Sequence, residues 1–170
     1  MTRPAIRPFI RADLDWLVAT HDRLYAQEAG FDATFGAVVR DAAQQLLDRA
    51  DPRELGFVAE VAKARVGSIF STRLDDDTGQ VRLFLILPDW RGSGLAPRML
   101  AAAEGFARAQ GCTRMRLWTH ESHAAACALY AREGWRRGPR CPVHNYGHDL
   151  VEVRWDKDLA EIALPDRLNR

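Results

Sequence analysis

The sequence predicts a mixed α/β domain, and three patterns lead to that fold class. Residues 81–87 are largely apolar on both faces, which is typical of a central strand covered by helices on both sides. Apolar residues recur at helical spacing over residues 95–110, and residues 114–119 then alternate as a strand does. A strand, a helix and a strand in this order are typical of α/β proteins. Residues 56–62 and 65–74 predict an antiparallel hairpin in front of that unit.

The remaining elements follow from the same periodicities. Each helix ends where glycine or Asp-Pro interrupts the pattern. With 170 residues, and about 150 residues per domain, we expect residues 1–170 to form a single domain. The outer strands are predicted at residues 5–10 and 150–155, and the other helices at residues 12–28, 31–50 and 124–133.

Composition excludes several classes of protein. Lys and Arg number 24 against 23 Asp and Glu, so the net charge is +1, whereas dedicated nucleic-acid binders carry a strongly basic face. No apolar run approaches the ~18 residues of a membrane span, and the N-terminus lacks the apolar core of a signal peptide. The 3 cysteines form no disulfide framework, so we expect reduced thiols in a cytoplasmic protein without nucleic-acid or membrane partners.

A glycine-rich turn, Arg91-Gly92-Ser93-Gly94, separates the central strand from the next helix. Consecutive backbone N–H groups at such a turn bind anions, glycine lets a phosphate approach closely, and arginine adds a cation. The Lys-Ser/Thr of a P-loop is absent, and so is the third glycine of a dinucleotide fingerprint. The pyrophosphate of coenzyme A is the remaining ligand class, and a plain strand–turn–helix without a ligand stays open.

Two blocks of the sequence resemble the GNAT superfamily of N-acyltransferases. An Arg-x-x-Gly-x-Ala pattern that ends at Ala96, after a strand ending in Leu-Pro, resembles the family's acetyl-CoA-binding motif. Residues 126–135 resemble its A..LY...GF helix, with Trp135 in place of Phe. The resemblance covers residues 6–159. Three blocks, at residues 24–31, 117–119 and 146–151, most resemble the acetyltransferase half of MarR-type regulator/GNAT fusion proteins. We expect no counterpart of their DNA-binding half in this chain.

The resemblance implies a single-domain GNAT fold, with a mixed, mostly antiparallel sheet flanked by helices and acetyl-CoA lying where two strands part. The Phe84 N–H would meet the acetyl carbonyl, and the N–H and C=O of Ile86 would meet the pantetheine amides. His123 stands where the family often has an Asn that contacts pantetheine, and Pro97 is expected at the first helical position. The expected cofactor-binding residues are Phe84, Leu85, Ile86, Arg91, Gly92, Ser93, Gly94, Leu95, Ala96, Pro97 and His123.

Tyr130 occupies the general-acid position of the family. A phenol with an ordinary pKa of ~10 can protonate a departing thiolate whose thiol has a pKa of ~8.5. Cys127 lies near the same helix face, where we expect a small packed side chain. The alternative interpretation of Tyr130 is a tyrosine packed against the sheet with its hydroxyl satisfied.

The general base is less defined. Some members of the family carry a Glu at the start of the central strand, but this sequence has Gln80 near that place, and an amide cannot act as a base. We expect residues 25–31 and 146–150 to face each other across the acceptor site. Candidate bases on these segments, each of which also reads as a structural or solvated residue, are Glu28, His148 and Asp149.

The function that follows is transfer of the acetyl group of acetyl-CoA to a primary amine by direct attack. The acceptor is a small molecule or a peptide whose identity the sequence does not reveal. The alternative is a GNAT-like module that binds acyl-CoA as a sensor or scaffold without turnover. GNAT domains often pair, so the resemblance allows a homodimer, but the sequence does not reveal the oligomeric state. No metal site is expected, although metal-like spacings occur at His120-x2-His123 and Cys141-x2-His144-x3-His148.

Overall fold

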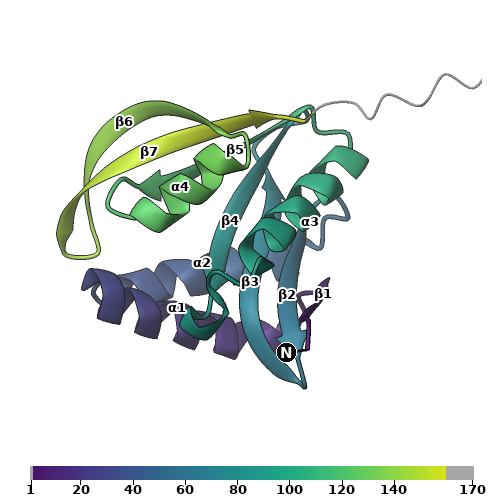
Figure 1. Cartoon of the computed structure of the whole chain (residues 1–170), viewed down its shortest axis with the longest axis horizontal. Coiled ribbons are helices and arrows are strands. Elements are labelled where there is room, and N and C mark those ends of the chain that lie inside the picture. The colour runs from purple at the N-terminus through teal and green to yellow at the C-terminus, as the bar shows by residue number, and fades with distance from the viewer. Residues whose placement is uncertain (1, 160–170) are drawn as a thin grey trace, which may run out of the picture.

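The structure, a computed structural model that describes residues 2–159, is built on one seven-stranded sheet of order β1-β2-β3-β4-β5-β7-β6 (Figure 1). Within these residues, neighbouring strands are antiparallel except for β4 and β5. Two short 3₁₀ helices, η1 and η2, precede α1 and α3. The elements are β1 (Ala5–Pro8), η1 (Arg11–Asp13), α1 (Leu14–Ala29), α2 (Thr34–Arg49), β2 (Leu55–Val61), β3 (Ala64–Arg73), β4 (Thr78–Ile86), η2 (Pro88–Trp90), α3 (Leu95–Ala109), β5 (Arg114–His120), α4 (Ala124–Arg132), β6 (Arg136–Asn145) and β7 (His148–Asp158).

The mixed α/β class and the unit of β4, α3 and β5 are confirmed. The sequence did not predict β6, which is mostly exposed and therefore shows no alternation of polar and apolar residues. β6 and β7 form a long hairpin, whose two strands are joined by a tight turn at residues 146–147. The part of the single-domain prediction that falls on residues 160–170 lies outside the described residues.

Helices cover both faces of the sheet because successive strand residues point to opposite sides. Phe70 of β3 is buried in a cluster with Leu17 of α1. Its neighbour Ile69 is buried in the other cluster, with Met99 of α3. Figure 1 shows α1 and α2 lying together, apart from α3 and α4. No helix in residues 2–159 is long and apolar enough to cross a membrane.

The site depends on where β4 and β5 separate. They pair over only three residue pairs, which end at Gln80 and Arg116. Beyond Gln80, Leu83 has a φ of +48°, and the ladder between β3 and β4 shifts register at the same place. The Ser68 hydroxyl donates a hydrogen bond of 2.8 Å to the Leu83 carbonyl. Because a bulge bends its strand, β4 turns away from β5 and leaves a space between them.

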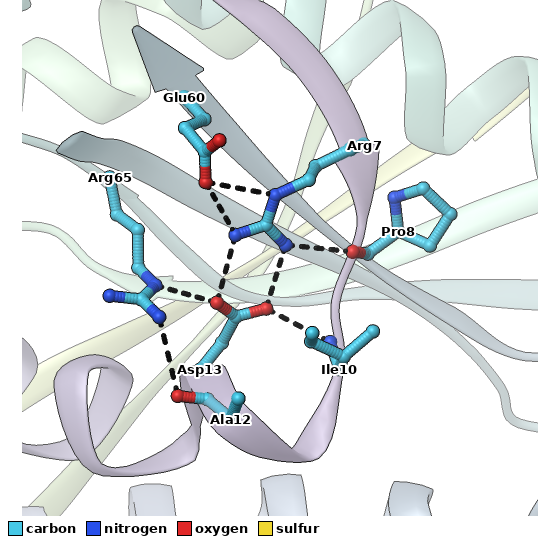
Figure 2. A network of polar contacts seen from close by, with 7 residues as sticks. All are labelled: Arg7, Pro8, Ile10, Ala12, Asp13, Glu60 and Arg65. Carbon is cyan, nitrogen blue, oxygen red and sulfur yellow. Dashed lines mark hydrogen bonds and ion pairs between the residues drawn. The ribbon is translucent and has the colours of Figure 1, made fainter. Parts of the chain in front are cut away.

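A buried carboxylate ties the first strands to the start of α1 (Figure 2). The side chain of Asp13 is fully buried and accepts hydrogen bonds from both Nη atoms of Arg7, at 2.8 and 2.9 Å. Arg65 donates to the same carboxylate at 2.6 Å, and Glu60 accepts from Arg7 at 2.7 Å. Burial alone would raise the pKa of Asp13, but the hydrogen bonds from Arg7, the Ile10 N–H and Arg65 hold it well below its usual range. The network therefore joins β1, β2 and β3 to η1.

We expect Asp13→Asn to destabilise the fold by about 3 kcal/mol, the low end for breaking a buried pair, because Arg7 and Arg65 keep some contact with water. The control Asp15→Asn removes an exposed partner of Arg40 and should leave stability nearly unchanged. Since the folded-state pKa of Asp13 is depressed, its contribution is complete at neutral pH and fades as the pH falls below about 4. Urea unfolding of all three proteins at pH 7 and pH 3 measures both effects, and equal stabilities of the two variants at pH 7 would contradict this role.

Candidate active site

The glycine-rich turn between η2 and α3 is open to solvent. Gly92 and Gly94 have φ values of +73° and +83°, and a Cβ added at either would meet nothing within 4 Å. α3 begins at Leu95, whose side chain is buried, and the first N–H groups of a helix have no helical partner. Pro97 is the third residue of α3 and not the first, so the N–H that it lacks falls among these unpaired groups. The turn offers room and donors for an anion.

Arg91 leaves this turn and reaches α1. Its Nη1 pairs with Oε1 of Glu28 at 2.8 Å, and its Nε donates to the Ile86 carbonyl at 3.3 Å. Glu28, the sequence-based candidate for a general base, therefore faces Arg91 and does not line the cavity between the strands. The Ile86 carbonyl, expected to meet pantetheine, accepts from Arg91 in this structure. The Ser93 hydroxyl donates to the Trp90 carbonyl at 2.6 Å and so holds the turn.

The end of β4 divides its backbone between β3 and the space beside β5. Leu85, one of the expected cofactor-binding residues, pairs with β3 and has a buried side chain. The N–H of Leu87 donates to the Val66 carbonyl of β3 at 3.0 Å. N–H groups alternate along a strand, so those of Phe84 and Ile86 point away from β3 and into the space that β5 leaves.

A cavity of about 400 Å³ lies where β4 and β5 part, and Phe84 and Tyr130 both line it. Tyr130 is 5% exposed, and its hydroxyl makes no hydrogen bond with any residue in 2–159. Burial raises the pKa of Tyr130, and Tyr25 and Cys127 raise it further. α4 thus brings a neutral phenol to the gap in the sheet, and α1, α2 and the β6–β7 hairpin complete the cavity.

The tip of the β6–β7 hairpin closes one end of this cavity against the α1–α2 connection. The rings of Tyr146 and Phe31 are 4.8 Å apart. The Asp32 N–H donates to the Tyr146 carbonyl at 3.1 Å, and Nε2 of His148 lies 2.7 Å from the Gly30 carbonyl. The two segments that the sequence predicts to face each other across the acceptor site are therefore in direct contact. His148 is used in this contact and does not line the cavity.

His120 and His123 belong to the aromatic lining of the cavity. Burial lowers the pKa of both, and His120 lowers that of His123 further. The His123 ring packs 5.3 Å from Tyr25 and edge-on at 5.7 Å from His120. His123 thus contacts other aromatic residues of the cavity, and its expected contact with the cofactor stays a prediction. Residues 2–159 contain no group of three side chains that could hold a metal ion.

His21 lies within the helix that the sequence predicts at residues 12–28, but the sequence assigns it no role, because nothing in a periodic pattern distinguishes a core residue from a cavity residue. Its ring is 2% exposed and lines the cavity. Nδ1 lies 2.8 Å from the Leu17 carbonyl, which can only accept, so Nδ1 carries the proton. Nε2 has no partner in residues 2–159. Burial lowers the pKa of His21 to about 4, so Nε2 presents a lone pair at neutral pH.

Comparison with known proteins agrees with the fold. A profile of the acetyltransferase (GNAT) family matches residues 18–135. The chain belongs to this family. It is 33% identical over 82 residues to acetyltransferase YE1169 of Yersinia enterocolitica. The match covers 48% of this chain and 57% of that relative, so the chain spans little more than half of the relative's length.

Solved GNAT structures superpose over nearly the whole chain. The structure of yncA from Salmonella typhimurium with its cofactor acetyl-CoA is 19% identical, with a TM-score of 0.77 and coverage of 98% of this chain and 100% of that one. Ribosomal-protein-alanine N-acetyltransferase from Brucella melitensis is 19% identical, with a TM-score of 0.76 and coverage of 91% and 99%. The α/β architecture is therefore the GNAT fold.

We expect the His21 ring to stay neutral throughout the physiological range, because its pKa is about 4. Its NMR resonances should not change between pH 8 and pH 6. The unfolded chain takes up this proton near pH 6.5, so the free energy of unfolding should fall as the pH drops from about 6.5 toward 4. His21→Gln should remove that part of the pH dependence. A His21 resonance that titrates near pH 6.5 would show that the ring is not buried as described.

Proposed function

We propose that this GNAT protein is an N-acetyltransferase that moves the acetyl group of acetyl-CoA to a primary amine by direct attack. The observation that carries the proposal is the parting of β4 and β5, which leaves the Phe84 N–H without a strand partner beside a cavity that Tyr130 also lines. Family membership supports the same activity. The closer likeness to the acetyltransferase half of MarR-type fusions stays a prediction.

The residues around the turn fit coenzyme A, whose thioester supplies the acetyl group. Space above Gly92 and Gly94 admits a pyrophosphate, and the N–H groups of Leu95 and Ala96 would bind it. Arg91 would add a cation, because its half-exposed pair with Glu28 opens at little cost. On β4, the Ile86 N–H would bind a pantetheine amide and the Phe84 N–H the acetyl carbonyl.

The residues of the cavity supply the groups that acetyl transfer needs. As the amine nitrogen attacks the carbonyl carbon, the Phe84 N–H stabilises the negative oxygen. The C–S bond then breaks, and Tyr130 gives its proton to the sulfur. The nitrogen loses one proton to solvent and Tyr130 takes one back from solvent, so the products are an N-acetylated amine, free coenzyme A and the restored phenol. The raised pKa of Tyr130 keeps the phenol protonated but makes it a weak acid. Its contribution to the rate therefore lies at the low end of the range for general-acid catalysis.

Release of free coenzyme A by the purified protein, measured over a mixed panel of amines, tests the activity. Release that depends on both acetyl-CoA and an amine supports the enzyme. Binding of acetyl-CoA without release on any amine supports the non-catalytic sensor or scaffold module instead. Calorimetric titration with acetyl-CoA distinguishes that module from a protein that does not bind the donor.

The turn's role in donor binding is tested by two matched glycine variants. Gly94 and Gly111 have φ values of +83° and +89°, both in open space, so alanine at either position strains the backbone by about 1–2 kcal/mol. We expect the Kd for acetyl-CoA to rise tenfold or more, about 1.4 kcal/mol, in Gly94→Ala only. Calorimetry measures Kd, and thermal melts confirm equal strain. Equal affinities in the two variants would refute the pyrophosphate site.

Tyr130→Phe should lower kcat by about 10²-fold. It should leave Tm nearly unchanged, because the hydroxyl has no partner in residues 2–159 and the ring keeps its contacts with Trp135 and Trp155. Steady-state kinetics and a thermal melt of both proteins check the two expectations. Joint loss of stability and activity would indicate a packing role. Unchanged kcat, with chemistry rate-limiting, would remove Tyr130 from the mechanism.

A further inference from the structure

Two opposite charges face the cavity without pairing. Arg82 of β4 and Glu152 of β7 are both half-buried, and both line it. Neither side chain has an ion pair or a hydrogen bond with any residue in 2–159. Burial and then Glu152 raise the pKa of Tyr146, whereas Arg82 lowers it, so both charges lie near the same ring. The cavity therefore presents a separated cation and anion.

Strand register places the two charges there. Arg82 pairs with Phe70 of β3, which is buried beneath α1 and α2. The Arg82 side chain therefore lies on the face of the sheet that α1 and α2 cover. Glu152 pairs with His120 across β5 and β7, and both line the cavity. Among the charges that act on Arg82, Arg49 and Glu54 pair with each other at 2.7 Å. Arg82 also borders a second, open pocket, which Asp51, Asp75 and Asp76 line as well. Arg82 forms no ion pair with any of these groups in residues 2–159, so its guanidinium can meet an anion from outside the chain.

The chemistry of these groups selects a zwitterion. A partly buried charge without a partner costs free energy, which a ligand of opposite charge recovers. A guanidinium binds a carboxylate through two parallel N–H···O hydrogen bonds. The carboxylate of Glu152 attracts an ammonium group through its opposite charge. A free amino acid carries both groups on one small molecule.

The same molecule also fits the reacting atoms. Arg82 precedes Phe84 by two residues, so their Cα atoms are at most about 7 Å apart. In an α-amino acid one carbon separates carboxylate and amine, so a carboxylate at Arg82 brings the amine toward the carbonyl bound at the Phe84 N–H. Nε2 of His21 is unpartnered and accepts an amine N–H. Tyr25 and Phe35, whose rings are 4.4 Å apart, surround the rest of the ligand with apolar surface.

We propose that the acceptor is a free α-amino acid with an apolar side chain, held by its carboxylate at Arg82 and attracted through its ammonium group by Glu152. The proposal rests on the proposed acetyl transfer. A polyamine fits less well, because Arg82 repels a second cation. A peptide N-terminus fits less well because no carboxylate adjoins its amine.

Coenzyme A release with L-leucine, L-leucinamide and spermidine tests the proposal. Leucine and its amide share the amine and the side chain and differ only at the carboxylate. We expect kcat/KM for leucine to exceed that for leucinamide by tenfold or more in the wild-type protein. Arg82→Met should bring this ratio close to one. Arg40→Gln, which removes an exposed arginine on the outer side of α2, should leave the ratio unchanged.

Each outcome decides the matter. Release with amines but without preference for leucine over leucinamide overturns the acceptor class and leaves the acetyltransferase proposal standing. Preference for spermidine, or an unchanged ratio in Arg82→Met, overturns it as well. No release with any amine overturns the proposed function, and the acceptor class with it. The wild-type ratio needs no variant, so the test holds even if Arg82→Met fails to fold.

Discussion

The bulge in β4 is the constraint on which the site depends. A sheet strand normally uses its N–H groups on both sides, but Leu83 turns the strand after its last pair with β5 at Gln80. Two consequences follow from this one bend. The backbone of Phe84 and Ile86 keeps donors that no neighbouring strand takes, and α4 can bring Tyr130 through to the cavity. The Ser68–Leu83 hydrogen bond supports the bend from the side of β3.

Two apolar clusters hold the parted strands in place, one on each face of the sheet. The α3 face supplies a rigid base for the turn, because Leu95 buries its side chain at the point where the helix begins. The α1 and α2 face supplies one wall of the cavity, which is the proposed acceptor side, and the buried carboxylate of Asp13 fixes the start of α1 to three strands. Both halves of the site are thus carried by elements that the core already orders.

Local patterns in the sequence predict the parts of this structure that depend on local geometry. The glycine-rich turn follows from the positive φ that Gly92 and Gly94 allow. Tyr130 lies in a helix that the sequence predicts at residues 124–133. The sequence did not predict β6, because the residues of a mostly exposed strand do not alternate between polar and apolar. Arg82 and Glu152 come together only through the register of strands far apart in the chain. Similarly, the partner of Glu28 is set by tertiary contact, which no spacing rule contains.

The Arg91–Glu28 ion pair joins the turn to the last helical turn of α1, a helix that also lines the cavity. Any anion that binds Arg91 must compete with Glu28. Binding of an anion at the turn therefore changes the free energy of ligand binding at α1. Thermodynamic linkage makes this effect reciprocal. Because the pair is half-exposed, the coupling free energy has a ceiling of about 1 kcal/mol, roughly a fivefold change in affinity. Through this ion pair alone, an anion at the turn and a ligand at α1 would therefore change each other's affinity by no more than about fivefold.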